Sequence, residues 1–155
     1  MVDLSRLEGA GPHPNMRAKD AASIILFDRA GGDLKVLVGK RSKKHVFMPD
    51  LFVFPGGKRD MSDYRLSFAS DLKDQTHQKL FKTFKRPATT SSTRALALAA
   101  MRELQEETGL SSWDESFCRF GPNLTPLRFV ARAITPPGHI RRYDTRFFSA
   151  FVDEL

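Results

Sequence analysis

The chain has 155 residues, of which 41% are hydrophobic and 28% charged. That length suits one domain with its own core, and the apolar content excludes a chain that is disordered throughout. A single cysteine, Cys118, excludes an intrachain disulfide and a multi-cysteine zinc site. The net charge of +7 favours a polyanionic or phosphorylated ligand, although a need for solubility explains it equally well.

Targeting signals are absent from the pattern of the chain. No apolar run approaches the length of a membrane span, and residues 1–19 lack the charged start and apolar stretch of a secretory signal. The single cysteine fits a reducing compartment. We therefore predict a cytoplasmic protein without a membrane partner, in which a loose lead-in at 1–19 precedes one domain at 20–155.

Three short apolar runs predict strands in the first part of the chain. Ala21–Phe27 and Leu34–Val38 flank a turn-forming segment, and together they predict a β-hairpin. Leu51–Phe54 predicts a third strand. It runs into Pro55–Gly57, where we expect strand pairing to stop and the backbone to bend.

One short helix and two further strands are predicted around the longest helix. The apolar spacing within Gln78–Phe84 predicts a helix that Pro87 ends. Strands are expected near Leu127–Ile134 and Thr145–Val152. This order of elements favours an α/β fold in which a helix packs on a mixed sheet.

The segment Arg94–Thr108 predicts the longest helix, because it holds strong helix formers and neither glycine nor proline. Ala97, Met101 and Leu104 recur at helical spacing and predict its buried face. Gly109 supplies a left-handed stop. Three hydroxyl residues are candidates for the N-terminal cap: Ser91, Ser92 and Thr93.

The last turns of this helix carry Glu103, Glu106 and Glu107, which fall within an arc of about 100°. Like charges at these spacings destabilise a helix by about 0.2–0.5 kcal/mol per pair, and these carboxylates face the negative end of its dipole. A hard divalent cation such as Mg²⁺ would make both effects favourable, and Arg102 could brace one carboxylate. A solvated acidic patch is the alternative that the helix alone leaves open.

A longer motif contains these residues. Arg102–Leu110 reads R-E-L-Q-E-E-T-G-L and matches the second half of the Nudix box, G-x5-E-x7-R-E-U-x-E-E-x-G-U with U apolar, at every defined position. The chain therefore resembles the Nudix hydrolases, over about residues 20–152.

The first half of the box departs from the pattern. Gly57 fits the opening glycine, and Asp63 stands after five intervening residues in place of glutamate. Between Asp63 and Arg102 lie 38 residues where the box has 7, so the box carries a long insertion at about 64–93. If the insertion lies earlier, the glutamate position falls on Arg94 instead.

The resemblance implies a fold and a chemistry. The fold is a Nudix-like α/β/α sandwich with a mixed β-sheet, and the reaction is Mg²⁺- or Mn²⁺-dependent hydrolysis of a nucleoside diphosphate linked to another group X. The implied catalytic residues are Glu103, Glu106 and Arg102, with Glu103 either a ligand or the base. The implied metal ligands are Glu103, Glu106, Glu107 and the Gly56 backbone, and Gly57 lies where a diphosphate approaches closely.

The substrate prediction depends on residues before the box. Arg41 and Ser42, followed at the right spacing by Phe54–Gly57, are similar to the upstream motif of the coenzyme A diphosphatase branch, although Val46 and Asp50 depart from it. A long insertion is also a feature of one peroxisomal acyl-coenzyme A hydrolase group. We predict coenzyme A or an acyl derivative as substrate, with ADP-ribose or a nucleotide sugar as the alternative. The basic and polar residues predicted to bind this substrate are Arg41, Ser42, Arg141 and Arg142. The alternative is that they are ordinary solvated residues of surface loops.

Two other classes of function stay open. One is a catalytically silent Nudix-like module that senses a nucleotide, against which the retained glutamate cluster argues. The other is nucleic-acid binding through the basic surface, which no helix-turn-helix, zinc-finger or aromatic RNA-binding pattern supports. We expect a small-molecule diphosphate as partner and no nucleic acid, and a homodimer stays open.

Overall fold

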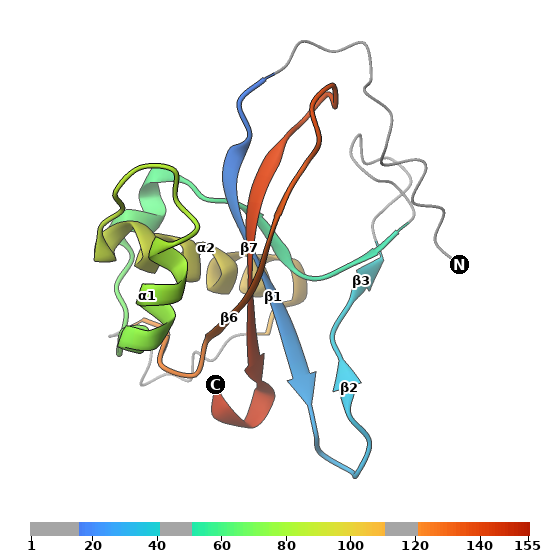
Figure 1. Cartoon of the computed structure of the whole chain (residues 1–155). Coiled ribbons are helices and arrows are strands. Elements are labelled where there is room, and N and C mark those ends of the chain that lie inside the picture. The colour runs from blue at the N-terminus through green and yellow to red at the C-terminus, as the bar shows by residue number, and fades with distance from the viewer. Residues whose placement is uncertain (1–15, 41–50, 111–120) are drawn as a thin grey trace.

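The computed structural model describes residues 16–40, 51–110 and 121–155 (Figure 1). Its main sheet has the strand order β2-β1-β7-β6, and β5 also pairs with β1. The strands are β1 (Lys19–Asp28), β2 (Lys35–Val36), β5 (Gly56–Lys58), β6 (Arg128–Ile134) and β7 (Tyr143–Phe151). Because β1 and β7 run parallel while the other pairs are antiparallel, the sheet is mixed, as predicted.

The predicted hairpin is confirmed, but the third strand joins a different sheet. β1 pairs with β2 through Phe27 opposite Val36. The strand predicted at Leu51–Phe54 is present as the shorter β4 (Phe52–Val53). It pairs with β3 (Gly39–Lys40) in a separate two-stranded sheet.

The expectation that pairing stops at Pro55–Gly57 is wrong. Gly56 and Gly57 begin β5 and pair with Ser23 and Ala22 of β1. A Cβ atom on Gly56 would lie 2.6 Å from the Cα atom of Ser23, closer than real contacts allow. Glycine is therefore what lets this strand approach β1, and the residue type serves close packing here and not a turn.

The longest helix, α2, runs over Thr90–Thr108 and begins four residues before its predicted start. Its N-cap is Thr89, whose hydroxyl accepts a hydrogen bond from the Ser92 N–H at 3.2 Å. The helix ends where predicted, at Gly109, which has a φ of 68° in the left-handed region.

The shorter helix, α1, covers Asp74–Phe81, so it lies earlier than the predicted Gln78–Phe84. The hydroxyl and N–H of Thr83 both donate to the Leu80 carbonyl, at 2.7 and 2.8 Å. In a continued helix that carbonyl would accept the N–H of Phe84, so Thr83 ends the helix.

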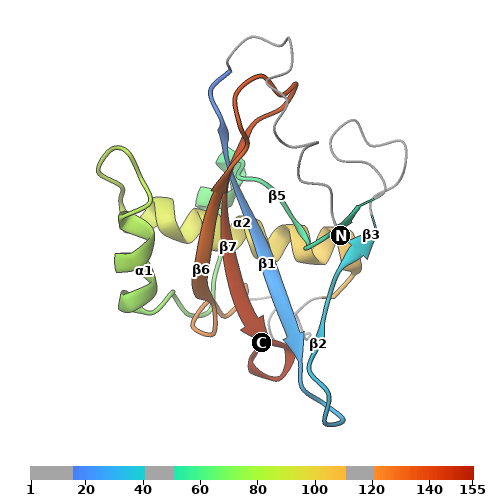
Figure 2. The same cartoon turned by 45° about the vertical axis from the view of Figure 1, so that its right-hand side comes forward.

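Both helices lie on one face of the sheet in the described part of the chain (Figures 1 and 2). Ala22, Ile24 and Leu26 alternate along β1 toward this face and pack with the buried side of α2. The predicted stripe of α2 is buried, as are Leu80 of α1 and Phe148 of β7. Neither described helix has the length and apolar character of a bilayer-spanning segment.

The segment between the first and second halves of the box packs at the N-terminal end of α2. Nδ1 of His77 lies 2.7 Å from the Thr93 hydroxyl, and Asp71 pairs with Arg94. Leu72 and Leu80 of this segment belong to the same core as the sheet. The segment therefore lengthens the helical layer at the end of α2 that is remote from the three glutamates.

Candidate active site

Arg102 lies at the centre of a cluster of carboxylates near the C-terminal end of α2. Its Nη1 donates to Glu103 Oε1 at 2.8 Å and to Glu106 Oε2 at 3.1 Å, and its Nε donates to Asp63 Oδ1 at 2.8 Å. These contacts raise the pKa of Arg102, with the hydrogen bond to Asp63 as the largest cause. One guanidinium thus partly neutralises three acids that lie close together.

Asp63 is fully buried and comes from the short 3₁₀ helix η2 (Met61–Arg65). Its Oδ2 accepts hydrogen bonds from the Asp60 N–H at 2.7 Å and from Arg102 Nη2 at 3.2 Å. The same Nη2 donates to the Lys58 carbonyl at 3.1 Å. Arg102 therefore joins η2, the end of β5 and α2 into one unit.

The glutamates differ in their exposure. The side chain of Glu103 is 17% exposed, whereas that of Glu106 is 57% exposed. Burial is the largest cause that raises the pKa of Glu103, and the negative charges of Glu106 and Glu107 add to it against the opposing effect of Arg102. The repulsion that the helical spacing predicts is thus present at Glu103.

The glycines of β5 face these side chains. The Gly56 N–H donates to Glu107 Oε2 at 3.1 Å. A Cβ atom on Gly57 would collide with the carboxylate of Glu103. The fold therefore brings Gly56 and Gly57 together with the three glutamates, although they lie far apart in the sequence.

Comparison with solved structures shows what this chain is similar to. The crystal structure of a NUDIX hydrolase from Alicyclobacillus acidocaldarius matches with a TM-score of 0.61 and 26% identity, over 88% of this chain and 70% of that chain. This match supports the resemblance of the chain to the Nudix hydrolases.

Two further solved structures match this chain more weakly. The NUDIX domain of Shewanella oneidensis NrtR complexed with ADP ribose has a TM-score of 0.46 and 16% identity, covering 98% of this chain and 71% of that chain. The C. elegans Ap4A hydrolase has a TM-score of 0.44 and 13% identity, covering 88% of this chain and 69% of that chain. No protein-family model and no curated protein matches the chain.

The two alignments of the first half of the Nudix box place different residues beside Arg102. Asp63, separated from Gly57 by five residues, is the residue that binds Arg102, whereas Arg94 pairs with Asp71 instead. The geometry therefore favours the alignment in which the insertion follows Asp63. The sequence offered a signal for this residue in its spacing from Gly57, but the change from glutamate to aspartate and the long separation obscured it.

The donor set of this site fits a hard divalent cation, because it combines carboxylates with two neighbouring glycines of β5 that carry no Cβ atoms. Within the described residues, no three acidic, histidine or cysteine side chains converge closely enough to hold a metal ion. The hydrogen bonds explain this, since Arg102 binds Glu103 and Glu106 while the Gly56 N–H binds Glu107.

Of the residues predicted to bind substrate, Gly57 lies at this site, against Glu103. Arg41 and Ser42 lie outside the described residues. Arg142 donates to the Thr135 carbonyl at 3.0 Å and to the Met16 carbonyl at 2.5 Å, so its guanidinium fastens the loop between β6 and β7. Arg141 is exposed in the same loop.

Proposed function

We propose that the chain hydrolyses a nucleoside diphosphate linked to another group X and requires Mg²⁺ or Mn²⁺. The observation that supports this most is the cluster in which Arg102 binds the buried Asp63 on one side and Glu103 and Glu106 on the other. Gly56 and Gly57 of β5, called the glycine corner below, lie against Glu107 and Glu103. The resemblance to the Nudix hydrolases supports the reaction class in general.

Each group has a proposed part in the reaction. Glu103, Glu106 and Glu107, with the Gly56 backbone, would hold a metal that neutralises phosphate charge and activates a water. Glu103 would serve either as one of these ligands or as the base that accepts a proton from water. Arg102 would orient Glu103 and Glu106, and the missing Cβ of Gly57 would admit a diphosphate.

Coenzyme A or an acyl derivative is the proposed substrate, on the motif that contains Arg41 and Ser42. The part of the inserted segment that carries Asp71 and His77 adds no support, because it contacts α2 at Thr93 and Arg94. These residues lie about ten positions before Glu103, or roughly 15 Å along the helix. A small-molecule substrate and a cytoplasmic location remain predictions.

The test is a product assay on the purified chain with Mg²⁺. Coenzyme A, ADP-ribose and a nucleotide sugar are supplied in separate reactions, and the expected products from coenzyme A are 3′,5′-ADP and phosphopantetheine. Glu106→Gln should lose at least about a hundredfold in turnover, as expected when a group that stabilises charge is removed. Asp74→Asn is the matched control, since Asp74 is an exposed acid in the first turn of α1.

The outcomes separate the proposals. Cleavage of ADP-ribose or the nucleotide sugar with coenzyme A untouched would contradict the coenzyme A proposal and keep the reaction class. Equal turnover in Glu106→Gln and the parent chain would contradict the site. Binding of a nucleotide without cleavage of any diphosphate would indicate a silent sensing module.

A further inference from the structure

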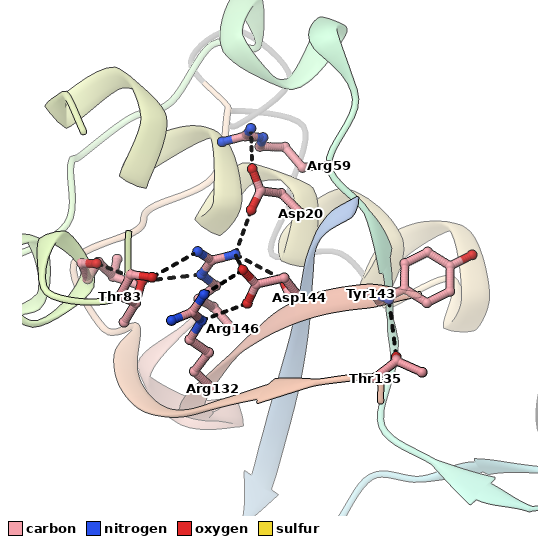
Figure 3. A network of polar contacts seen from close by, with 9 residues as sticks. Asp20, Arg59, Thr83, Arg132, Thr135, Tyr143, Asp144 and Arg146 are labelled. Atoms are coloured by element: carbon pink, nitrogen blue, oxygen red, sulfur yellow. Dashed lines mark hydrogen bonds and ion pairs between the residues drawn. The ribbon is translucent and has the colours of Figure 1, made fainter. Parts of the chain in front are cut away.

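A chain of alternating charges runs through the layer between the sheet and the inserted segment (Figure 3). Its centre is Arg146 of β7, whose side chain is 1% exposed. Nη1 of Arg146 donates to Asp20 Oδ1 at 2.6 Å and lies 3.3 Å from Asp144 Oδ2. Its Nε donates to the Thr83 hydroxyl of the inserted segment at 3.2 Å.

The two aspartates are direct neighbours across parallel strands, since Asp20 of β1 pairs in register with Asp144 of β7. Like charges in such positions destabilise a sheet unless a cation lies between them. Arg146 supplies that cation, and each aspartate also has an arginine of its own. Asp144 binds Arg132 through two hydrogen bonds of 2.7 Å, and Asp20 binds Arg59 at 2.7 Å.

The two ends of this network, Arg132 and Arg59, lie in different parts of the fold. Arg132 lies in β6, away from the glycine corner. Arg59 follows Gly56, Gly57 and Lys58 directly, and its backbone N–H donates to the Asp20 carbonyl at 2.9 Å. Asp20 therefore fixes Arg59 through both its backbone and its side chain.

Arg59 depends on Asp20 for its position. The Nη1 atom of Arg59 is buried and finds no hydrogen-bond partner within the described part of the chain. Its Nη2 binds Asp20, and its guanidinium lies 5.1 Å from the centre of the Tyr64 ring. The Arg59 side chain is only 16% exposed, so loss of the Asp20 carboxylate would leave a largely buried guanidinium without this ion pair and would favour its movement.

We propose that Asp20, oriented by Arg146, is a positioning residue for the metal-binding corner of the site. Asp20 holds Arg59, and Arg59 holds the end of β5, where the Lys58 carbonyl binds Arg102 and Gly57 packs against Glu103. This inference rests on the proposed function, because it assigns the corner to metal binding. By this inference, the Asp20–Arg59 pair contributes to function, whereas the Asp144–Arg132 pair only stabilises the fold.

The test compares Asp20→Asn with Asp144→Asn in the full chain, because both changes remove one carboxylate charge beside Arg146. Calorimetric titration with Mn²⁺ alone should show about tenfold weaker binding in Asp20→Asn, the effect typical of residues that orient ligands. Asp144→Asn should stay within about a factor of two of the parent chain. With substrate, Asp20→Asn should lower kcat more than it changes KM, since the glutamates would be misplaced while substrate groups remain.

Amide hydrogen exchange tests the same claim without metal. The Arg59 amide should exchange faster in Asp20→Asn and at the parent rate in Asp144→Asn. Arg59→Gln should reproduce the loss of Mn²⁺ affinity, which provides a second variant if Asp20→Asn folds poorly. Equal Mn²⁺ affinities and equal Arg59 exchange in the two asparagine variants would overturn the inference. A parent chain that binds no Mn²⁺ would contradict the proposed function, and the exchange comparison would still decide whether Asp20 positions the corner.

Discussion

Arg94 and Arg102 lie about two turns apart on α2, and each binds an aspartate from the segment between β5 and the helix. The surroundings of the two pairs differ. Asp71, the partner of Arg94, has a side chain that is 31% exposed, and it also lies 3.4 Å from His77 Nε2. Asp63, the partner of Arg102, is fully buried.

The difference shows how one residue pairing serves two purposes. The Arg94 pair connects the inserted segment to α2, and its neighbours include the His77 imidazole, the Leu72 N–H and the Phe68 ring. The Arg102 pair has two further carboxylates and the carbonyl of Lys58 on the same guanidinium. Excess negative charge beside a glycine backbone is what a metal-dependent site requires, whereas a balanced pair at a helix start stabilises the fold.

The largest expected effect separates the two aspartates. Asp63→Ala should lower the free energy of unfolding by about 3 kcal/mol, near the lower end for a broken buried ion pair, since Arg102 keeps Glu103 and Glu106. Asp71→Ala should cost at most about 1 kcal/mol, because its pair is partly exposed. Urea unfolding measures both, and equal losses would contradict the distinction drawn from burial.

A second variant tests how tightly the glycine corner fits against the glutamates. Gly57→Ala should cost about 1 kcal/mol, the scale of a weakened hydrogen bond, and reduce turnover, because its Cβ would push the flexible Glu103 carboxylate out of place. Gly39→Ala is the matched control in β3, where the nearest atom to a new Cβ would be the Val53 carbonyl oxygen at 4.0 Å. Thermal unfolding and turnover should change in the first variant only, and a neutral Gly57→Ala would show that the corner has room to spare.

The start of α2 gives a smaller effect. Thr89→Ala should cost about 1 kcal/mol in unfolding free energy, because it removes the side-chain acceptor for the Ser92 N–H. Ser91→Ala, one of the caps expected from the sequence, should be nearly neutral. A larger loss in Ser91→Ala would place the helix start nearer to the predicted position.

The smallest expected effect is the pH dependence of the stability that the Asp71–Arg94 pair contributes. Burial would raise the pKa of Asp71, but hydrogen bonds from Arg94 and the Leu72 N–H lower it more, so the folded-state pKa is below its ordinary value. The stability that this lowering contributes is present above the ordinary carboxyl pKa of about 4 and is lost as pH falls through the folded value.

Arg94→Gln measures that contribution. The parent chain should be more stable than the variant by at most about 1 kcal/mol near neutral pH, and this gap should narrow below about pH 4. Urea unfolding over the pH range gives the gap. A gap that is unchanged in acid would mean that packing of the Arg94 stem, and not its charge, stabilises the fold.

Features set by neighbouring residues were predictable from the sequence, and features set by distant partners were not. The C-terminal end of α2 was predictable because Gly109 and the charge pattern are local signals. The pairing of Gly56 with Ser23 was not, since a proline and two glycines read as a turn unless the neighbouring strand is known. Asp63 could not be assigned from sequence because its partner lies 39 positions away and the inserted segment leaves two alignments open.

The sequence by itself determined that an acidic helix end follows a glycine pair in a Nudix-like chain, because periodicity and motif spacing are properties of neighbouring residues. Only the tertiary structure decided which aspartate binds Arg102 and that Gly57 lies against Glu103. Those contacts depend on the path of about forty residues between the two halves of the box, and that path is set by the shared core of α1, α2 and the sheet.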